Sequence, residues 1–136
     1  MRRFALFLVV VCMLLAIPSV SCLAQDFKSY PGSKLDEKDS RDATAAAPGK
    51  RSEVYTTSDA FDKVYAFYKA LYKEYPMRGA PKLPSGQQIK WAFFIIDGGK
   101  DLLSSKHWMK IQRPYVGGAE GKDVRDITII QTVEAK

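Results

Sequence analysis

The stretch YTTSDAFDKVYAFYKALYKEYP, residues 55–76, constrains the fold more than any other part of this chain. Placed at about 100° per residue, its apolar and aromatic side chains occupy one arc of roughly 160°. These side chains are Phe61, Val64, Tyr65, Phe67, Tyr68, Leu71, Tyr72 and Tyr75. Ser58 or Asp59 can cap the first turn, and Pro76 ends the pattern after Tyr75. We therefore predict one long amphipathic helix whose aromatic side packs into the core.

The rest of the chain shows the alternation and turn signals of short strands. A weak strand is expected in 33–37, followed by 51–58, 89–97, 106–114 and 124–135. Between the first two, residues 39–50 are small, polar and proline-bearing, and we expect a loose loop there. The order is strand, strand, helix, strand, strand, strand. Because the last three strands have short links, we predict a single α+β domain, residues 25–136, with the helix packed on a mainly antiparallel sheet of four to five strands.

The first 24 residues have the three-part layout of a secretory signal peptide. Arg2 and Arg3 are followed by an apolar run, 4–17, which is short for a membrane span of about 20 residues. Cleavage after Ala24 would release a protein that starts at Gln25. Lipidation of Cys22 is the alternative, and it would leave the protein anchored to a membrane. We expect export, to the periplasm or the extracellular space, with membrane contact only during export or through lipid on Cys22.

Composition narrows the chemistry of the exported domain. Both cysteines, Cys12 and Cys22, fall within the leader, so cleavage after Ala24 leaves no disulfide and no cysteine nucleophile. The net charge of +6 falls to +4 without Arg2 and Arg3, and basic and acidic residues interleave. This pattern does not indicate a nucleic-acid partner. With one histidine and no remaining cysteine, the sequence predicts neither a metal site nor a cofactor.

His107 is the only histidine, so histidine-based acid–base chemistry would have to use it. It follows Ser104 and Ser105, and it could pair in space with Asp97 or Asp101 across a turn. A nucleophile, a base and an orienting acid are the minimum for a hydrolase. His107 and Asp97 are therefore the catalytic candidates of a small periplasmic enzyme, although an ordinary histidine at a strand end explains the pattern with fewer assumptions.

Four helix residues are the candidates for binding. Tyr65 and Tyr72 lie near one border of the aromatic side, where a ring can pack while its hydroxyl reaches water or a ligand. Lys69 and Lys73 belong to a basic face that could contact an anionic polymer, although such faces are normally just solvated. These features favour a non-enzymatic binding or accessory module that contacts an envelope protein or a small ligand. A small enzyme or a lipid-anchored envelope protein are the alternatives.

Three segments carry a resemblance: YPGSK near the predicted mature start, VYTTSDAFDKVYAFYKALYKE, and the terminal DITIIQTVEA. Together they resemble a set of small exported bacterial proteins of unknown function. The resemblance covers most of residues 30–135. It implies an α+β domain in the cell envelope of a Gram-negative bacterium, and it carries no catalytic residues with it.

Overall fold

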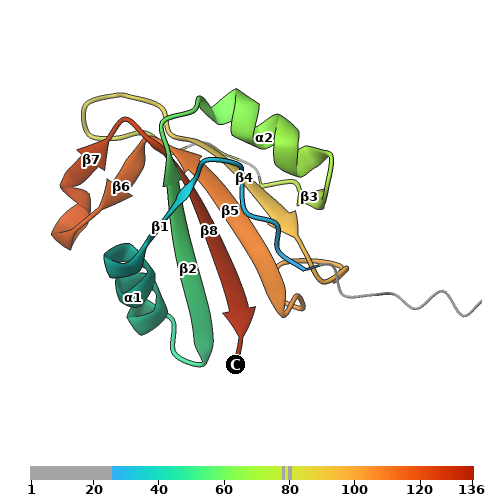
Figure 1. The fold of residues 1–136 in the computed structure, drawn as a ribbon. Helices are drawn as coiled ribbons and strands as arrows, with labels where there is room; N and C mark the ends of the chain where they lie inside the picture. The colour runs from blue at the N-terminus through green and yellow to red at the C-terminus, as the bar shows by residue number, and fades with distance from the viewer. Residues whose placement is uncertain (1–25, 78, 80) are drawn as a thin grey trace, which may run out of the picture.

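A computed structural model describes residues 26–77, 79 and 81–136, and the α+β class predicted from the sequence is confirmed. Its main sheet has six strands rather than the four to five expected, because two short strands, β1 and β3, pair with its edges. The order is β1-β2-β8-β5-β4-β3, and each neighbouring pair is antiparallel (Figure 1). These strands are β1 (Lys34–Asp36), β2 (Lys50–Thr57), β3 (Lys73–Tyr75), β4 (Lys90–Ile95), β5 (His107–Arg113) and β8 (Thr128–Ala135). A small second sheet joins β6 (Tyr115–Gly117) to β7 (Asp123–Arg125), with the short 3₁₀ helix η1 (Ala119–Gly121) between them.

Two α-helices pack against this sheet, α1 (Glu37–Ala46) and α2 (Phe61–Lys69). In Figure 1, α1 and the β6–β7 hairpin lie beside each other at the left, whereas α2 lies at the upper right. Successive residues of a strand point to opposite faces, so each face has its own core. On the α2 face, buried residues include Tyr68, Phe94 and Ile130, and on the other face Val54, Ile129 and Tyr115 pack together.

The predicted helix is shorter than expected, and its aromatic side is buried as expected. Val64 and Tyr68 are fully buried, and Tyr72 is 7% exposed. However, α2 ends at Lys69 rather than Tyr75, because residues Lys73–Tyr75 form β3 and pair with β4. Backbone pairing with a sheet edge therefore outweighs the helical pattern of the last turn. The predicted cap is also wrong, since Ala60 occupies the cap position without a side-chain hydrogen bond.

The loose loop expected at 39–50 is wrong, because most of that segment is helix α1. Asp36 caps it, accepting a hydrogen bond from Asp39 N at 2.9 Å. The sequence gives little sign of this helix, since it carries no apolar stripe of the kind that marks residues 61–75. Its stability comes instead from polar side chains that contact the edge of β2.

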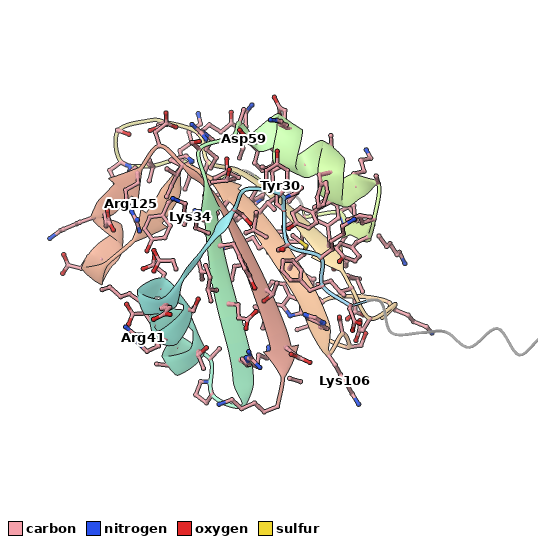
Figure 2. All side chains as sticks on the ribbon, in the orientation of Figure 1. Tyr30, Lys34, Arg41, Asp59, Lys106 and Arg125 are labelled. Carbon is pink, nitrogen blue, oxygen red and sulfur yellow. The ribbon has the colours of Figure 1, made fainter. Side chains whose placement is uncertain are left out.

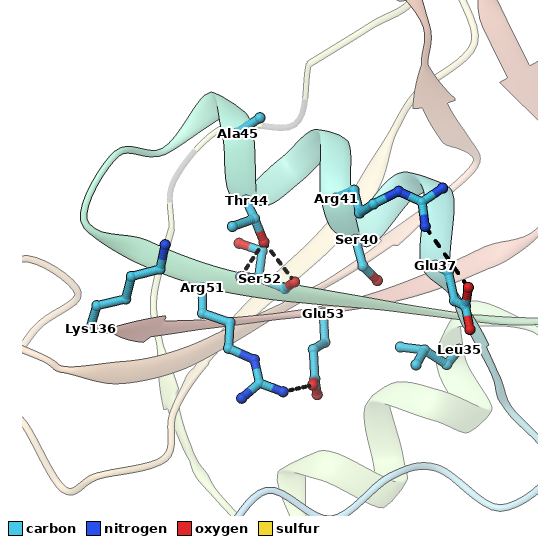
Figure 3. Close-up of a pocket in the computed structure, with 10 residues that line it drawn as sticks. All are labelled: Leu35, Glu37, Ser40, Arg41, Thr44, Ala45, Arg51, Ser52, Glu53 and Lys136. Carbon is cyan, nitrogen blue, oxygen red and sulfur yellow. Dashed lines mark hydrogen bonds and ion pairs between the residues drawn. The ribbon is translucent and has the colours of Figure 1, made fainter.

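Ser40 and Thr44, one helical turn apart, hydrogen-bond the backbone of β2, and Figure 3 shows the bonds of Thr44 to Ser52. Strand β1 covers β2 only from Val54 to Thr56, so the backbone groups of Ser52 face α1 instead of a strand. Thr44 Oγ1 accepts from Ser52 N at 3.0 Å and donates to Ser52 O at 3.1 Å. Ser40 Oγ accepts from Val54 N at 2.8 Å. The helix thus extends the edge pairing that β1 begins, which protects an exposed strand edge.

The signal peptide predicted for residues 1–24, including Cys22, lies outside the described residues. Among the residues that the structure describes, no helix has both the length and the apolar character required to span a bilayer.

The contact between α1 and β2 generates a stability prediction. We expect Thr44→Val to lower the free energy of unfolding by about 1–3 kcal/mol, because the N–H of the buried Ser52 loses its acceptor. Thr56→Val is the matched control, since Thr56 makes no side-chain hydrogen bond within the described part of the chain, and its effect should stay within about 0.5 kcal/mol. Urea denaturation of the two variants measures the difference. Equal stabilities would show that the hydroxyl of Thr44 does not hold the edge.

Candidate functional site

A half-open pocket of about 330 Å³ on the α2 face contains the only histidine. We call it the His107 pocket, and its lining residues come from β2, β8, β5 and the segment before β1. They are Asp26, Phe27, Arg51, Glu53, Tyr55, His107, Thr132 and Glu134. The sheet register explains the grouping, because Glu134 of β8 lies between Arg51 of β2 and His107 of β5. Residues far apart in the sequence therefore meet across three strands.

One side of the His107 pocket is an ordered polar cluster. Arg51 pairs with Glu53, with 2.5 Å between Nη2 and Oε1, and the hydroxyl of Tyr55 donates to Glu53 Oε2 at 3.0 Å. Burial, reinforced by the hydrogen bond to Glu53, raises the pKa of Tyr55, so this phenol stays protonated at neutral pH. The only arginine of the pocket is thereby occupied by one of its three carboxylates.

The other charged groups of the pocket have no such partner. Within the described part of the chain, the carboxylates of Glu134 and Asp26 make no ion pair, and the imidazole of His107 makes no hydrogen bond. Beside them lie the rings of Phe27 and Tyr55, whose centroids are 5.4 Å apart. The pocket therefore offers free carboxylates next to aromatic surface.

The segment that carries Asp26 and Phe27 is held in place by tyrosines of the core. The hydroxyl of Tyr72 donates to Asp26 O at 2.9 Å and accepts from Lys28 N at 2.7 Å. Further along, the hydroxyl of Tyr30 donates to Asp59 Oδ2 at 2.6 Å (Figure 2). Tyr72, a binding candidate in the sequence, is thus buried, and its hydroxyl positions one wall of the pocket.

The remaining binding candidates do not gather into one site. The hydroxyl of Tyr65 donates to Glu74 Oε2 at 2.6 Å, and Lys69 Nζ lies 5.2 Å from the centre of the Tyr65 ring. Lys73 belongs to β3, where the alternation of the strand places it on the face opposite Glu74. Tyr65 and Lys69 therefore form a local contact on α2, and Lys73 lies apart from it.

The pairing of Asp97 with His107 takes a different form from that expected. Asp97 Oδ1 accepts from Ser105 Oγ at 2.6 Å and from Gly99 N at 3.1 Å. Asp97 Oδ2 accepts from the backbone N–H groups of Lys106 at 2.6 Å and His107 at 3.3 Å. No hydrogen bond joins this carboxylate to the imidazole in the described structure. Asp97 therefore organises the loop between β4 and β5 and does not orient His107 for catalysis.

Sequence reasoning identified His107 but missed Arg51, Glu53 and Glu134. Nothing in their local pattern marks them, since each reads as an ordinary polar residue of a half-buried strand. Only the register, which pairs residue 51 with 134 and 134 with 107, brings them together.

A second, shallower hollow of about 610 Å³ lies along the edge of β2 beside α1 (Figure 3). Two of its cations already have carboxylate partners, Arg41 with Glu37 at 3.8 Å and Arg51 with Glu53. The adjacent backbone of Ser52 is bonded to Thr44, as described above. Within the described residues, Lys136 is left without an ion pair and the hydroxyl of Ser52 without a hydrogen bond, so this hollow contains no unpaired pair of carboxylates like that of the His107 pocket.

Among the described residues, no three histidine, cysteine, aspartate or glutamate side chains are arranged to hold a metal ion. Comparison with known proteins adds no functional assignment: no protein-family model, no curated protein and no solved structure matches the chain.

The hydrogen bonds of Asp97 generate a pH-dependent prediction. Burial alone would raise its pKa, but the bonds from Ser105, Lys106, Gly99 and His107 outweigh burial and hold the pKa below its usual range. A depressed pKa means that ionised Asp97 stabilises the fold above about pH 4 and that this contribution is lost as the pH falls through the depressed value. We expect Asp97→Asn to cost about 1–3 kcal/mol at pH 7 and much less at pH 2.

Chemical denaturation at the two pH values measures this effect. His107→Ala is the control, because Asp97 accepts from the backbone of residue 107 and not from its imidazole. A loss of stability for Asp97→Asn that is the same at both pH values would contradict the proposed role of the ionised carboxylate.

Proposed function

We propose that this protein is an exported, non-enzymatic binding module of the bacterial cell envelope, and that its His107 pocket binds a small ligand carrying a positive charge. One observation supports a cationic ligand. Two carboxylates, those of Glu134 and Asp26, line the pocket without an ion-pair partner among the described residues. A cationic group entering the pocket would supply that partner.

The charge balance of the pocket favours a cation over an anion. Three carboxylates line it against one arginine, and that arginine is paired with Glu53. Within the part of the chain that the structure describes, an anion would meet Glu134 and Asp26 with no free fixed cation to compensate, whereas a cation would meet both. The rings of Phe27 and Tyr55 add a surface on which an ammonium group or an alkyl chain can lie.

Acid–base catalysis is the alternative to binding. It would have to proceed without Asp97, whose carboxylate already accepts hydrogen bonds from the loop between β4 and β5. His107 would then need Glu53 or Glu134 as its partner. Glu53 already accepts from Arg51 and Tyr55, and no hydrogen bond links Glu134 to the imidazole in the described structure. These observations support a binding role more directly than a catalytic one.

Export is supported by the layout of residues 1–24, with its basic start, apolar run and small-residue exit. A domain of 112 residues without cysteine is compatible with an oxidising compartment, since it can be stable through its core alone. The envelope location and the absence of a lipid anchor are therefore proposals that follow from the sequence.

Binding of a diamine tests the ligand class. We expect 1,4-diaminobutane to bind weakly to the purified protein, and Glu134→Gln to weaken binding about two- to fivefold, because an exposed ion pair contributes about 0.2–1 kcal/mol. Titration followed by NMR measures the affinity and locates the shifted resonances. Glu120→Gln is the matched control. Glu120 lies in η1, away from the pocket, and its carboxylate pairs with Lys122. Equal affinities for the two variants, or no binding by the wild type, would refute the cation site.

Processing of the N-terminus tests export and anchoring separately. We expect the mature protein to begin at Gln25 and to carry no lipid, because Cys22 and Ala24 supply the small side chains that signal peptidase prefers. Mass spectrometry of the protein recovered from the envelope fraction gives the mature mass. Incorporation of a labelled fatty acid that is lost in Cys22→Ser would show instead that the protein is lipid-anchored.

A further inference from the structure

The opposite face of the same three strands carries a second half-open pocket, also about 330 Å³, which we call the Lys110 pocket. Its floor is one cross-strand row, Val54 of β2, Gln131 of β8 and Lys110 of β5. Its walls are α1 on one side and the β6–β7 hairpin on the other, the two elements that lie together at the left of Figure 1. The pocket therefore shares its strands with the His107 pocket but none of its lining residues.

The two carboxylates that line this pocket are already neutralised. Asp39 Oδ2 accepts from Arg125 Nη2 of β7 at 3.0 Å, and the same guanidinium lies 3.9 Å from the centre of the Tyr115 ring. Figure 2 shows Arg125 on the hairpin beside α1. Asp42 pairs with Lys38 on α1, with 2.9 Å between Nζ and Oδ2.

Lys110 is the one charged lining residue of this pocket for which the described structure shows neither an ion pair nor a hydrogen bond. It lies in the middle of the sheet, with Gln131 on one neighbouring strand and Phe93 on the other. Burial of its amine lowers the pKa of Lys110, which is the expected response of an ammonium group that loses water without gaining an anion. The amine of Lys110 therefore has no anionic partner among the described residues.

We propose that the Lys110 pocket binds a small organic carboxylate, whose negative group pairs with the ammonium of Lys110. The amide of Gln131, next to Lys110 across the strands, can donate a second hydrogen bond to the same carboxylate. The apolar part of the ligand then lies against Val54, Ala43 and Ile129, which line the rest of the floor and the α1 wall. This inference does not depend on the cationic ligand proposed for the other face.

The neutralised carboxylates give the site its selectivity for anions. If Asp39 or Asp42 were unpaired, either would attract the ammonium of Lys110 and repel an incoming carboxylate. Their pairing with Arg125 and Lys38 leaves Lys110 available. A monocarboxylate with a longer aliphatic chain or an aromatic ring should bind better than acetate, because only the larger molecules cover the apolar floor.

Titration of the purified protein with acetate, butyrate and benzoate, followed by NMR, tests the proposal. We expect butyrate and benzoate to bind more tightly than acetate, and Lys110→Met to weaken butyrate binding at least tenfold while keeping the apolar stem and the fold. Lys106→Met is the matched control on the neighbouring loop, and it should bind as the wild type does.

The pKa of Lys110 supplies a second measurement. Butyrate would not change this pKa if Lys110 had only a structural role. With the lysine side chains labelled with carbon-13, the pKa of Lys110 should rise when butyrate is added, since a bound anion stabilises the charged form. The other titratable groups that line this pocket are Asp39 and Asp42 from α1 and Tyr115 from the hairpin, and their own pairing should not change. Equal butyrate affinity in Lys110→Met, or a pKa of Lys110 that butyrate does not alter, would overturn the proposal and leave an ordinary lysine directed at solvent.

Discussion

The His107 pocket and the Lys110 pocket both depend on the insertion of β8 between β2 and β5. The last strand of the chain supplies Thr132 and Glu134 to the α2 face and Ile129 and Gln131 to the other, so neither pocket exists until β8 has paired on both sides. Six of the described residues of β8 are buried or partly buried, in keeping with a central strand. Because its partners lie about 75 and 20 residues earlier, the central pairing joins parts of the chain that are distant in sequence.

The alternation of side chains along these three strands separates two chemistries that are mixed in the sequence. His107 and Lys110 belong to one strand but point to opposite faces, and so do Glu53 and Val54. The faces then differ in what covers them. On one face, Tyr72 of the α2 region fixes the segment that carries Asp26, and on the other, Arg125 fixes the hairpin against Asp39 of α1. The segment before β1 thus forms one wall of the His107 pocket, and α1 with the hairpin forms the walls of the Lys110 pocket. These segments also supply charged residues to the two pockets.

The sequence predicted the parts of the fold that have strong local patterns. The aromatic side of residues 61–72 and the alternation of 106–114 specify their own structure, because hydrophobic burial acts on residues that are neighbours in a helix or strand. Helix α1 was not predicted, because Ser40 and Thr44 hold it against the edge of β2 by hydrogen bonds. Such contacts do not require a periodic pattern of apolar residues in the sequence. The last turn expected of α2 became β3 because β4 offers backbone partners there, which a periodicity cannot reveal.

Of the candidate sites, the sequence could supply His107 as a single scarce residue, but not its surroundings. The interleaving of charges, which did not indicate a nucleic-acid partner, is an average over two faces. Once the strands are paired, Glu53 and Glu134 fall on the face of His107, while Lys110 falls on the other, where the acidic residues are matched by Arg125 and Lys38. A chain with a weak overall charge can therefore present one pocket with unpaired carboxylates and another whose unpaired charge is a lysine, since the pairing of strands, and not composition, decides which charges share a surface.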